Sequence, residues 1–162
     1  MIKQLLADIE ATPWGTAVRE STWLFPTIES IHVLMLVLVV GSIMVVDLRL
    51  LNLTSRNRSV KELTDEVLPW TWTAFVGAAI TGTLLFSSSA SKYWGIWQFE
   101  AKMAMLALAA LNMGLFHIGA FRSVAQWDRA PARPPLAAKL AGGISLCAWV
   151  IVIALGRWIG FA

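Results

Sequence analysis

The pattern of hydrophobic and polar positions divides the chain into a short amphipathic start and four long apolar segments. Residues 23–51, 67–88, 99–122 and 136–160 are each long and apolar enough to cross a bilayer as a helix. Lipid offers backbone N–H and C=O groups no hydrogen-bond partners, so such segments form α-helices. The sequence therefore predicts an all-α integral membrane protein, in which residues 1–162 form one four-helix transmembrane bundle.

The first eleven residues follow a helical rather than a uniformly apolar pattern. One side of that helix would carry Ile2, Leu5, Leu6 and Ile9. This spacing predicts a short amphipathic helix that lies on the membrane surface. A turn at Thr12-Pro13-Trp14-Gly15 is expected to separate it from the first span.

Composition supports a membrane protein and argues against a nucleic-acid-binding one. The chain is 57% hydrophobic, and most of its nine Trp fall at segment ends, where amphipathic rings favour the membrane interface. The net charge of +3 comes from cations in short loops, which is a signal of topology. The lone Cys147 can form no intrachain disulfide. The expected surroundings are therefore the lipid bilayer.

The loop cations also predict an orientation. The second loop offers only Lys92, whereas the first and third loops hold Arg56, Arg58, Lys61, Arg129 and Arg133. Cytoplasmic loops carry an excess of Lys and Arg. Both termini are therefore predicted to lie outside the cytoplasm.

Ionisable residues within the spans are the candidates for function, because they are costly in lipid and usually face a partner, a cofactor or the protein interior. Glu29 and Lys102 each lie 20 positions before an arginine, Arg49 or Arg122, that marks the same end of its span. Opposite charges at one depth can offset each other's cost of burial. The sequence thus predicts a buried Glu29–Lys102 pair, with either a functional or a purely structural role.

Counting back from Arg49 and Arg122 also gives the depths of the two histidines, which are candidate metal ligands. His32 lies 17 positions before its arginine and His117 only 5, so their depths differ by roughly 18 Å along a helix axis. This difference disfavours one haem held by both imidazoles. His32 is instead level with Met105, with Met103 close by, and a His/Met set suits haem or copper. Each histidine has the alternative of being a hydrogen-bonded packing residue.

Three stretches carry a resemblance to known families. Ile31-His32-Val33-Leu34 followed by Gly41 resembles the first-helix pattern of CopD copper-resistance membrane proteins and of HemJ-type membrane proteins. A further CopD run is similar to Thr81-Gly82, Tyr93, Lys102 and Ala109-Ala110-Leu111-Asn112, and His117 is nearer the HemJ pattern. The run Asp47 to Leu51 resembles the signature of a little-characterised bacterial family of four-helix membrane proteins.

The resemblance implies a four-helix bundle of the bacterial inner membrane concerned with haem b or copper. The positions carried over are His32, Lys102 and His117. Three functions stay open: a haem-b- or metal-binding redox protein, a CopD-like copper-handling or uptake protein, and a structural accessory subunit. The sequence shows no hydrolase constellation or phosphate loop, so no enzyme class is assigned. Beyond lipid, the candidate partners are a second copy of the chain and another membrane or extracytoplasmic protein.

Overall fold

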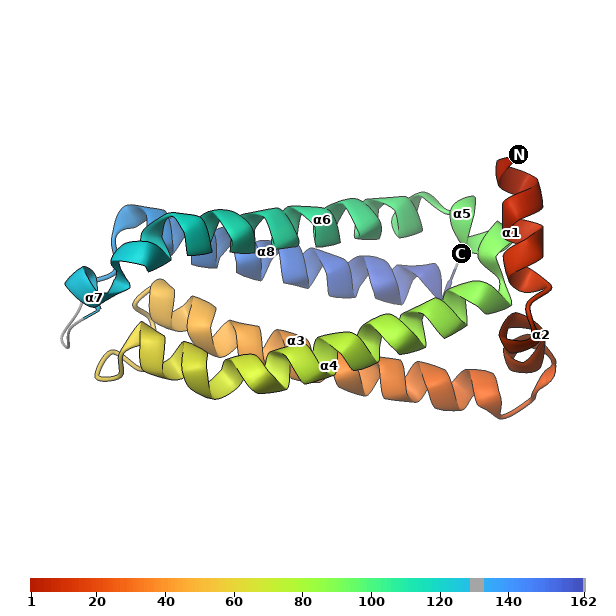
Figure 1. Ribbon diagram of the computed structural model, residues 1–162, viewed down its shortest axis with the longest axis horizontal. Helices are drawn as coiled ribbons and strands as arrows, with labels where there is room; N and C mark the ends of the chain where they lie inside the picture. The colour runs from red at the N-terminus through yellow and green to blue at the C-terminus, as the bar shows by residue number, and fades with distance from the viewer. Residues whose placement is uncertain (129–132, 162) are drawn as a thin grey trace.

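Four long helices lie side by side in the computed structural model, which describes residues 1–128 and 133–161 (Figure 1). They are α3 (Leu24–Leu50), α4 (Val60–Ser88), α6 (Trp97–Ile118) and α8 (Leu136–Ile159). Each is long and apolar enough to span a membrane, and the described residues contain no strand. The predicted all-α four-helix bundle of a multi-pass membrane protein is confirmed. The predicted loop residue Arg129 lies outside the described residues.

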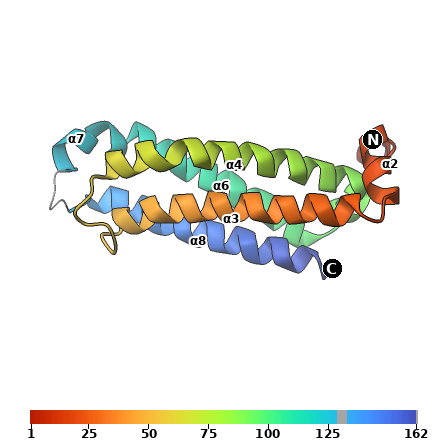
Figure 2. The same ribbon diagram turned by 90° about the horizontal axis from the view of Figure 1, so that it is seen from below.

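The long helices pack in the order α4, α3, α8, α6 (Figures 1 and 2). α3 contacts both α4 and α8, and α6 packs along α8. Within the described part of the chain, α4 and α6 do not pack along each other. The core where the four helices meet consists of Val39, Val40, Ala74, Ala109, Ala148, Trp149 and Val152. Its alanines let the helix backbones approach closely, as small residues do in membrane bundles.

The sides of the bundle expose large apolar side chains along every long helix, among them Leu34, Ile80, Leu111 and Val150. A soluble monomer rarely exposes contiguous apolar patches larger than a few hundred Å². In a bilayer the same surface contacts acyl chains, so the exposure agrees with embedding in lipid.

α4 begins at Val60 rather than at residue 67, where the uncharged run starts. Ser59 is its N-cap, because the Ser59 hydroxyl accepts a hydrogen bond from the Glu62 N–H at 3.0 Å. Lys61 then pairs with Asp65 one turn on, along an exposed helix face. The charges that suggested a loop therefore stabilise extra helical turns outside the apolar zone.

The N-terminal segment forms two short helices across one end of the bundle, where both termini also lie (Figure 1). α1 (Ile2–Glu10) confirms the predicted amphipathic helix. α2 (Pro13–Glu20) replaces the predicted turn, because the Thr12 hydroxyl caps it by accepting from the Gly15 N–H at 3.2 Å. Gly15 sits so close to α4 that a Cβ there would lie 2.6 Å from the Ser87 carbonyl oxygen.

Short elements complete the two ends of the bundle. α5 (Ala90–Trp94) joins α4 to α6 beside α1. At the opposite end, the 3-10 helix η1 (Ala120–Ser123) and α7 (Val124–Trp127) extend the chain beyond α6. The bundle thus has an end covered by α1, α2 and α5 and an end where the first and third loops meet.

Candidate functional site

His32 is held by a hydrogen bond that joins α3 to α4. Its Nδ1 lies 2.9 Å from Thr81 Oγ1, and that hydroxyl lies 2.7 Å from the carbonyl oxygen of Gly77. A carbonyl can only accept, so the one hydroxyl proton of Thr81 goes to Gly77 and His32 Nδ1–H donates to Thr81. When the ring is neutral, its Nε2 atom then carries the lone pair. This is the tautomer in which an imidazole binds a metal through Nε2.

Glycines of α4 provide the space that His32 and its neighbour Met35 occupy. A Cβ on Gly82 would lie 3.1 Å from His32 Cε1, and a Cβ on Gly77 would lie 2.9 Å from the Met35 sulfur. His32 and Met35 are three residues apart and therefore share one face of α3. Met35 is not among the predicted ligands, although its His-x-x-Met spacing from His32 is visible in the sequence.

Lys102 extends from α6 to α8. Its Nζ would lie 3.5 Å from a Cβ on Gly156 of α8. The described residues form four ion pairs, and neither Lys102 nor Glu29 belongs to one. Glu29 is exposed at the protein surface. The structure therefore does not form the predicted buried Glu29–Lys102 pair, because α3 and α6 are not packing neighbours and equal depth does not bring their side chains together.

A stack of aromatic rings lies near Glu29 at the covered end of the bundle. The ring centroids of Phe86 and Phe99 are 5.3 Å apart, and those of Tyr93 and Phe99 are 6.0 Å apart. Burial of the Tyr93 phenol, with the Glu29 carboxylate as the second cause, raises the pKa of Tyr93. The stack joins α4, α5 and α6 where α4 and α6 otherwise lack close packing.

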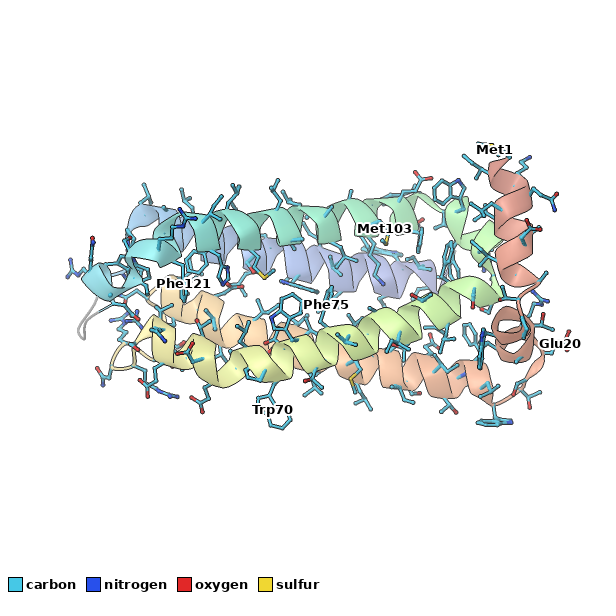
Figure 3. All side chains as sticks on the ribbon, in the orientation of Figure 1. Met1, Glu20, Trp70, Phe75, Met103 and Phe121 are labelled. Carbon is cyan, nitrogen blue, oxygen red and sulfur yellow. The ribbon has the colours of Figure 1, made fainter. Side chains whose placement is uncertain are left out.

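His117 lies in a separate place. Its Nδ1–H donates to the Met113 carbonyl oxygen at 2.8 Å, so Nε2 is the ring nitrogen left for a ligand. The ring borders a cavity of about 250 Å³ between α4 and α6, lined also by Leu68, Trp72, Met113 and Gly114. Nearby on α4, Phe75 points toward the α6–α8 pair whereas Trp70 points away from the bundle (Figure 3).

The three predicted cofactor ligands therefore lie in three different surroundings. His32 faces α4, His117 borders the α4–α6 cavity, and Met105 lines an apolar groove between α6 and α8. The neighbours of the two histidines on α4, Thr81 and Trp72, are separated by roughly 14 Å along the helix axis. Among the described residues, no three His, Cys, Asp or Glu side chains gather around a metal position. Each histidine is thus a ligand candidate by itself.

The most completely buried charge lies at the other end of the bundle, in Arg49. Its side chain is 0% exposed, Nε donates to the Arg58 carbonyl oxygen at 2.7 Å, and Nη2 lies 3.9 Å from Asp128 Oδ1. The Asp128 carboxylate also accepts from the backbone N–H groups of Val60 and Lys61, at 2.6 and 2.8 Å. These contacts fasten the first loop, the start of α4 and the residue after α7 together.

Asp47 points to a different neighbour. A Cβ on Gly142 of α8 would lie 3.0 Å from the Asp47 carbonyl oxygen, so α3 and α8 are in close contact there. The buried Asp47 Oδ2 has no hydrogen-bond partner among the described residues. The Asp47–Leu51 run therefore anchors α3 to α8 through Asp47 and to the loops through Arg49.

Fold and site together define a four-helix membrane protein with polar groups between its helices and a histidine of α3 hydrogen-bonded to α4. The chain belongs to a family described as "Family of unknown function (DUF6644)", whose model matches residues 20–162. This match includes all four long helices and the Asp47–Leu51 run, and it gives no link to CopD or HemJ proteins. Neither the curated proteins nor the solved structures that were compared give a match.

Proposed function

We propose that this chain is a haem-b- or metal-binding membrane protein with a redox or electron-transfer role, and that His32 is its metal ligand. The observation that carries the proposal is the hydrogen bond from His32 Nδ1 to Thr81, which leaves Nε2 with its lone pair. A bond of this kind orients a ligating imidazole and fixes its tautomer. The cofactor itself supplies the one-electron chemistry when it is bound.

The residues around His32 fit a centre with one protein imidazole better than a centre with two. His117 is too far away to share a single iron with His32, and Met105 faces the groove between α6 and α8. Gly82 leaves room for the ring edge of His32. Lys102 has no carboxylate partner within the described residues, so it would stabilise an acidic group of a bound cofactor.

Copper handling of the CopD kind is the second candidate, and Met35 favours it. His32 and Met35 lie one turn apart on the same face of α3, and both reach glycines of α4. Imidazole and thioether together suit copper. Two ligands on one helix face cannot occupy opposite sides of a haem, so this pair fits copper rather than a haem with two axial ligands.

Absorption spectra and copper content of the purified protein test both candidates. Cells would be supplied with a haem precursor and with copper, and the wild type compared with His32→Ala, Met35→Leu and His117→Ala. Haem binding predicts a Soret band that His32→Ala abolishes and His117→Ala weakens less. Copper binding predicts colourless protein whose copper is lost in both His32→Ala and Met35→Leu.

The outcome that overturns the proposal is equally clear. If His32→Ala keeps the full spectrum and metal content, His32 is a packing residue. If the wild type binds neither haem nor copper, the polar groups serve only to hold the helices, as Asn112 does when its Nδ2 donates to the Ala141 carbonyl oxygen at 2.9 Å. The chain is then a structural accessory subunit.

A further inference from the structure

A wide apolar groove lies between α6 and α8, on the side of the bundle that faces lipid. Its volume is about 590 Å³, within the range of roughly 300–1,000 Å³ that is common for binding sites of small molecules. Its lining residues include Met105 and Leu108 of α6 and Lys139, Leu140, Ile144 and Cys147 of α8. Several of these side chains are exposed at the protein surface, so the groove is open to the bilayer.

The lining of the groove is apolar throughout, and Lys139 marks one end of it. Among the described residues that line the groove, Lys139 is the only basic one, and it lies in the first turn of α8. Leu51, which follows the last residue of α3, lies at the same end, because a Cβ on Gly143 would be 3.8 Å from Leu51 Cδ2. The other α8 lining residues continue from there into the apolar zone. This order of one cation followed by an apolar channel matches a phospholipid, whose phosphate lies at the interface and whose chains lie deeper.

We propose that the groove binds an acyl chain of an anionic phospholipid and that Lys139 contacts its phosphate. Positive side chains near a membrane surface attract anionic lipids, and a basic residue next to an apolar groove adds selectivity for the headgroup. An interface with a second copy of the chain is less favourable. A two-fold axis along the membrane normal would place this face against itself and bring Lys139 near the same lysine of the partner. A lipid phosphate neutralises that charge instead.

Lipid titration of the purified protein tests the proposal by native mass spectrometry. Phosphatidylglycerol and phosphatidylcholine with identical acyl chains are the two probes. The wild type is expected to bind phosphatidylglycerol roughly fivefold more tightly, as one lysine at a lipid surface provides. Lys139→Gln should remove this preference and Lys139→Arg should keep it. Lys92→Gln, at an exposed position outside the groove, is the matched control and should leave the preference unchanged.

A second variant tests the binding of the acyl chain in the groove separately from the contact between Lys139 and the phosphate. Gly143→Leu places a side chain in the groove and should weaken the binding of both lipids while leaving the Lys139-dependent preference in place. Equal binding of the two lipids by the wild type, or an unchanged preference in Lys139→Gln, would overturn the proposal. Efficient oxidation of Cys147 to a disulfide-linked dimer in the bilayer would also overturn it, because Cys147 lines the groove and a second copy would then occupy this face.

Discussion

Arg49 Nη2 and Asp128 Oδ1 lie 3.9 Å apart, with side chains that are 0% and 3% exposed. Asp128 also caps α4 through the backbone N–H groups of Val60 and Lys61. Because carboxylates are favourable at helix N-termini, one side chain stabilises both the helix dipole and a buried guanidinium. The signature run that contains Arg49 thus serves as an anchor at the loop end of the bundle.

Replacing Asp128 by Ala should destabilise the protein strongly. The change leaves the Arg49 charge buried without a carboxylate and removes the two hydrogen bonds from the first turn of α4, so we expect a loss of about 3–5 kcal/mol. Asp128→Asn should cost less, since its amide oxygen can still accept from one N–H group. Glu62→Ala is the control, because the Arg58–Glu62 pair is exposed and worth at most about 1 kcal/mol. Reversible unfolding in mixed micelles measures all three, and equal losses for Asp128→Ala and Glu62→Ala would contradict the assignment.

The sequence carries the information for this anchor only in part. Arg49 belongs to the run that resembles a family signature, but its partner Asp128 follows the third span and is brought near only by the fold. The four spans are predictable because the length and hydropathy of each segment act locally. α2 was not predicted because its Pro13 and Gly15 are typical of a turn, whereas the Thr12 cap and the contact with Ser87 keep it helical.

The candidate site, too, is predictable from the sequence only in part. His32 is visible in the sequence as an ionisable residue in a span, whereas its partner Thr81 depends on which helix lies next to α3. Depth along the membrane can be counted from the sequence, but the order of helices around the bundle cannot. For that reason the predicted contact between Glu29 and Lys102 is absent even though the predicted register gives the two positions the same depth.

Glu29 and Lys102 should therefore behave independently. In a double-mutant cycle with Glu29→Gln and Lys102→Met, the changes in unfolding free energy should add to within about 0.3–0.5 kcal/mol. A direct ion pair would instead give a coupling energy well above that range. Unfolding measurements of the four proteins distinguish the two cases.

Thr81 should control the metal affinity of His32 if the proposed function is right. Thr81→Val keeps the shape of the side chain but removes the acceptor for His32 Nδ1–H, so the tautomer and orientation of the ring are no longer fixed. Loss of such a partner typically weakens metal binding about 10–100-fold. Thr81→Ser retains the hydroxyl and should retain most of the affinity. Titration of the apoprotein with haem or Cu(I) provides the comparison, and equal affinities of the Val and Ser variants would contradict it.

Alanine substitutions at three glycines should change the stability of the fold in different directions. Replacing Gly by Ala within a helix stabilises it by about 0.5–1 kcal/mol when the new methyl group has room. Gly114→Ala has that room, since nothing lies within 4 Å of its Cβ. Gly82→Ala would place a methyl group 3.1 Å from the rigid His32 ring, and its hydrogen bond to Thr81 would be strained. We expect Gly114→Ala to stabilise the fold and Gly82→Ala to destabilise it.

Gly77→Ala is the informative intermediate case. Its new Cβ would lie 2.9 Å from the Met35 sulfur, but that atom is the far end of a flexible side chain and can move. The loss of stability in Gly77→Ala should therefore be smaller than in Gly82→Ala. Thermal unfolding of the three variants in one detergent gives the order, and a Gly82→Ala protein as stable as Gly114→Ala would show that the His32 ring is not confined by α4.

The orientation of the chain can be tested with single cysteines in a Cys147→Ser background. We expect Gln4→Cys, in α1, to react with a membrane-impermeant maleimide in spheroplasts, and Asn57→Cys, in the first loop, to react only after lysis. The physical reason is that Arg56, Arg58 and Lys61 surround position 57 and favour the cytoplasmic side. Because both termini lie at one end of the bundle and the first loop lies at the other, the two sites must label on opposite sides. Labelling of Asn57→Cys in intact spheroplasts, with Gln4→Cys protected, would reverse the predicted orientation without altering the fold.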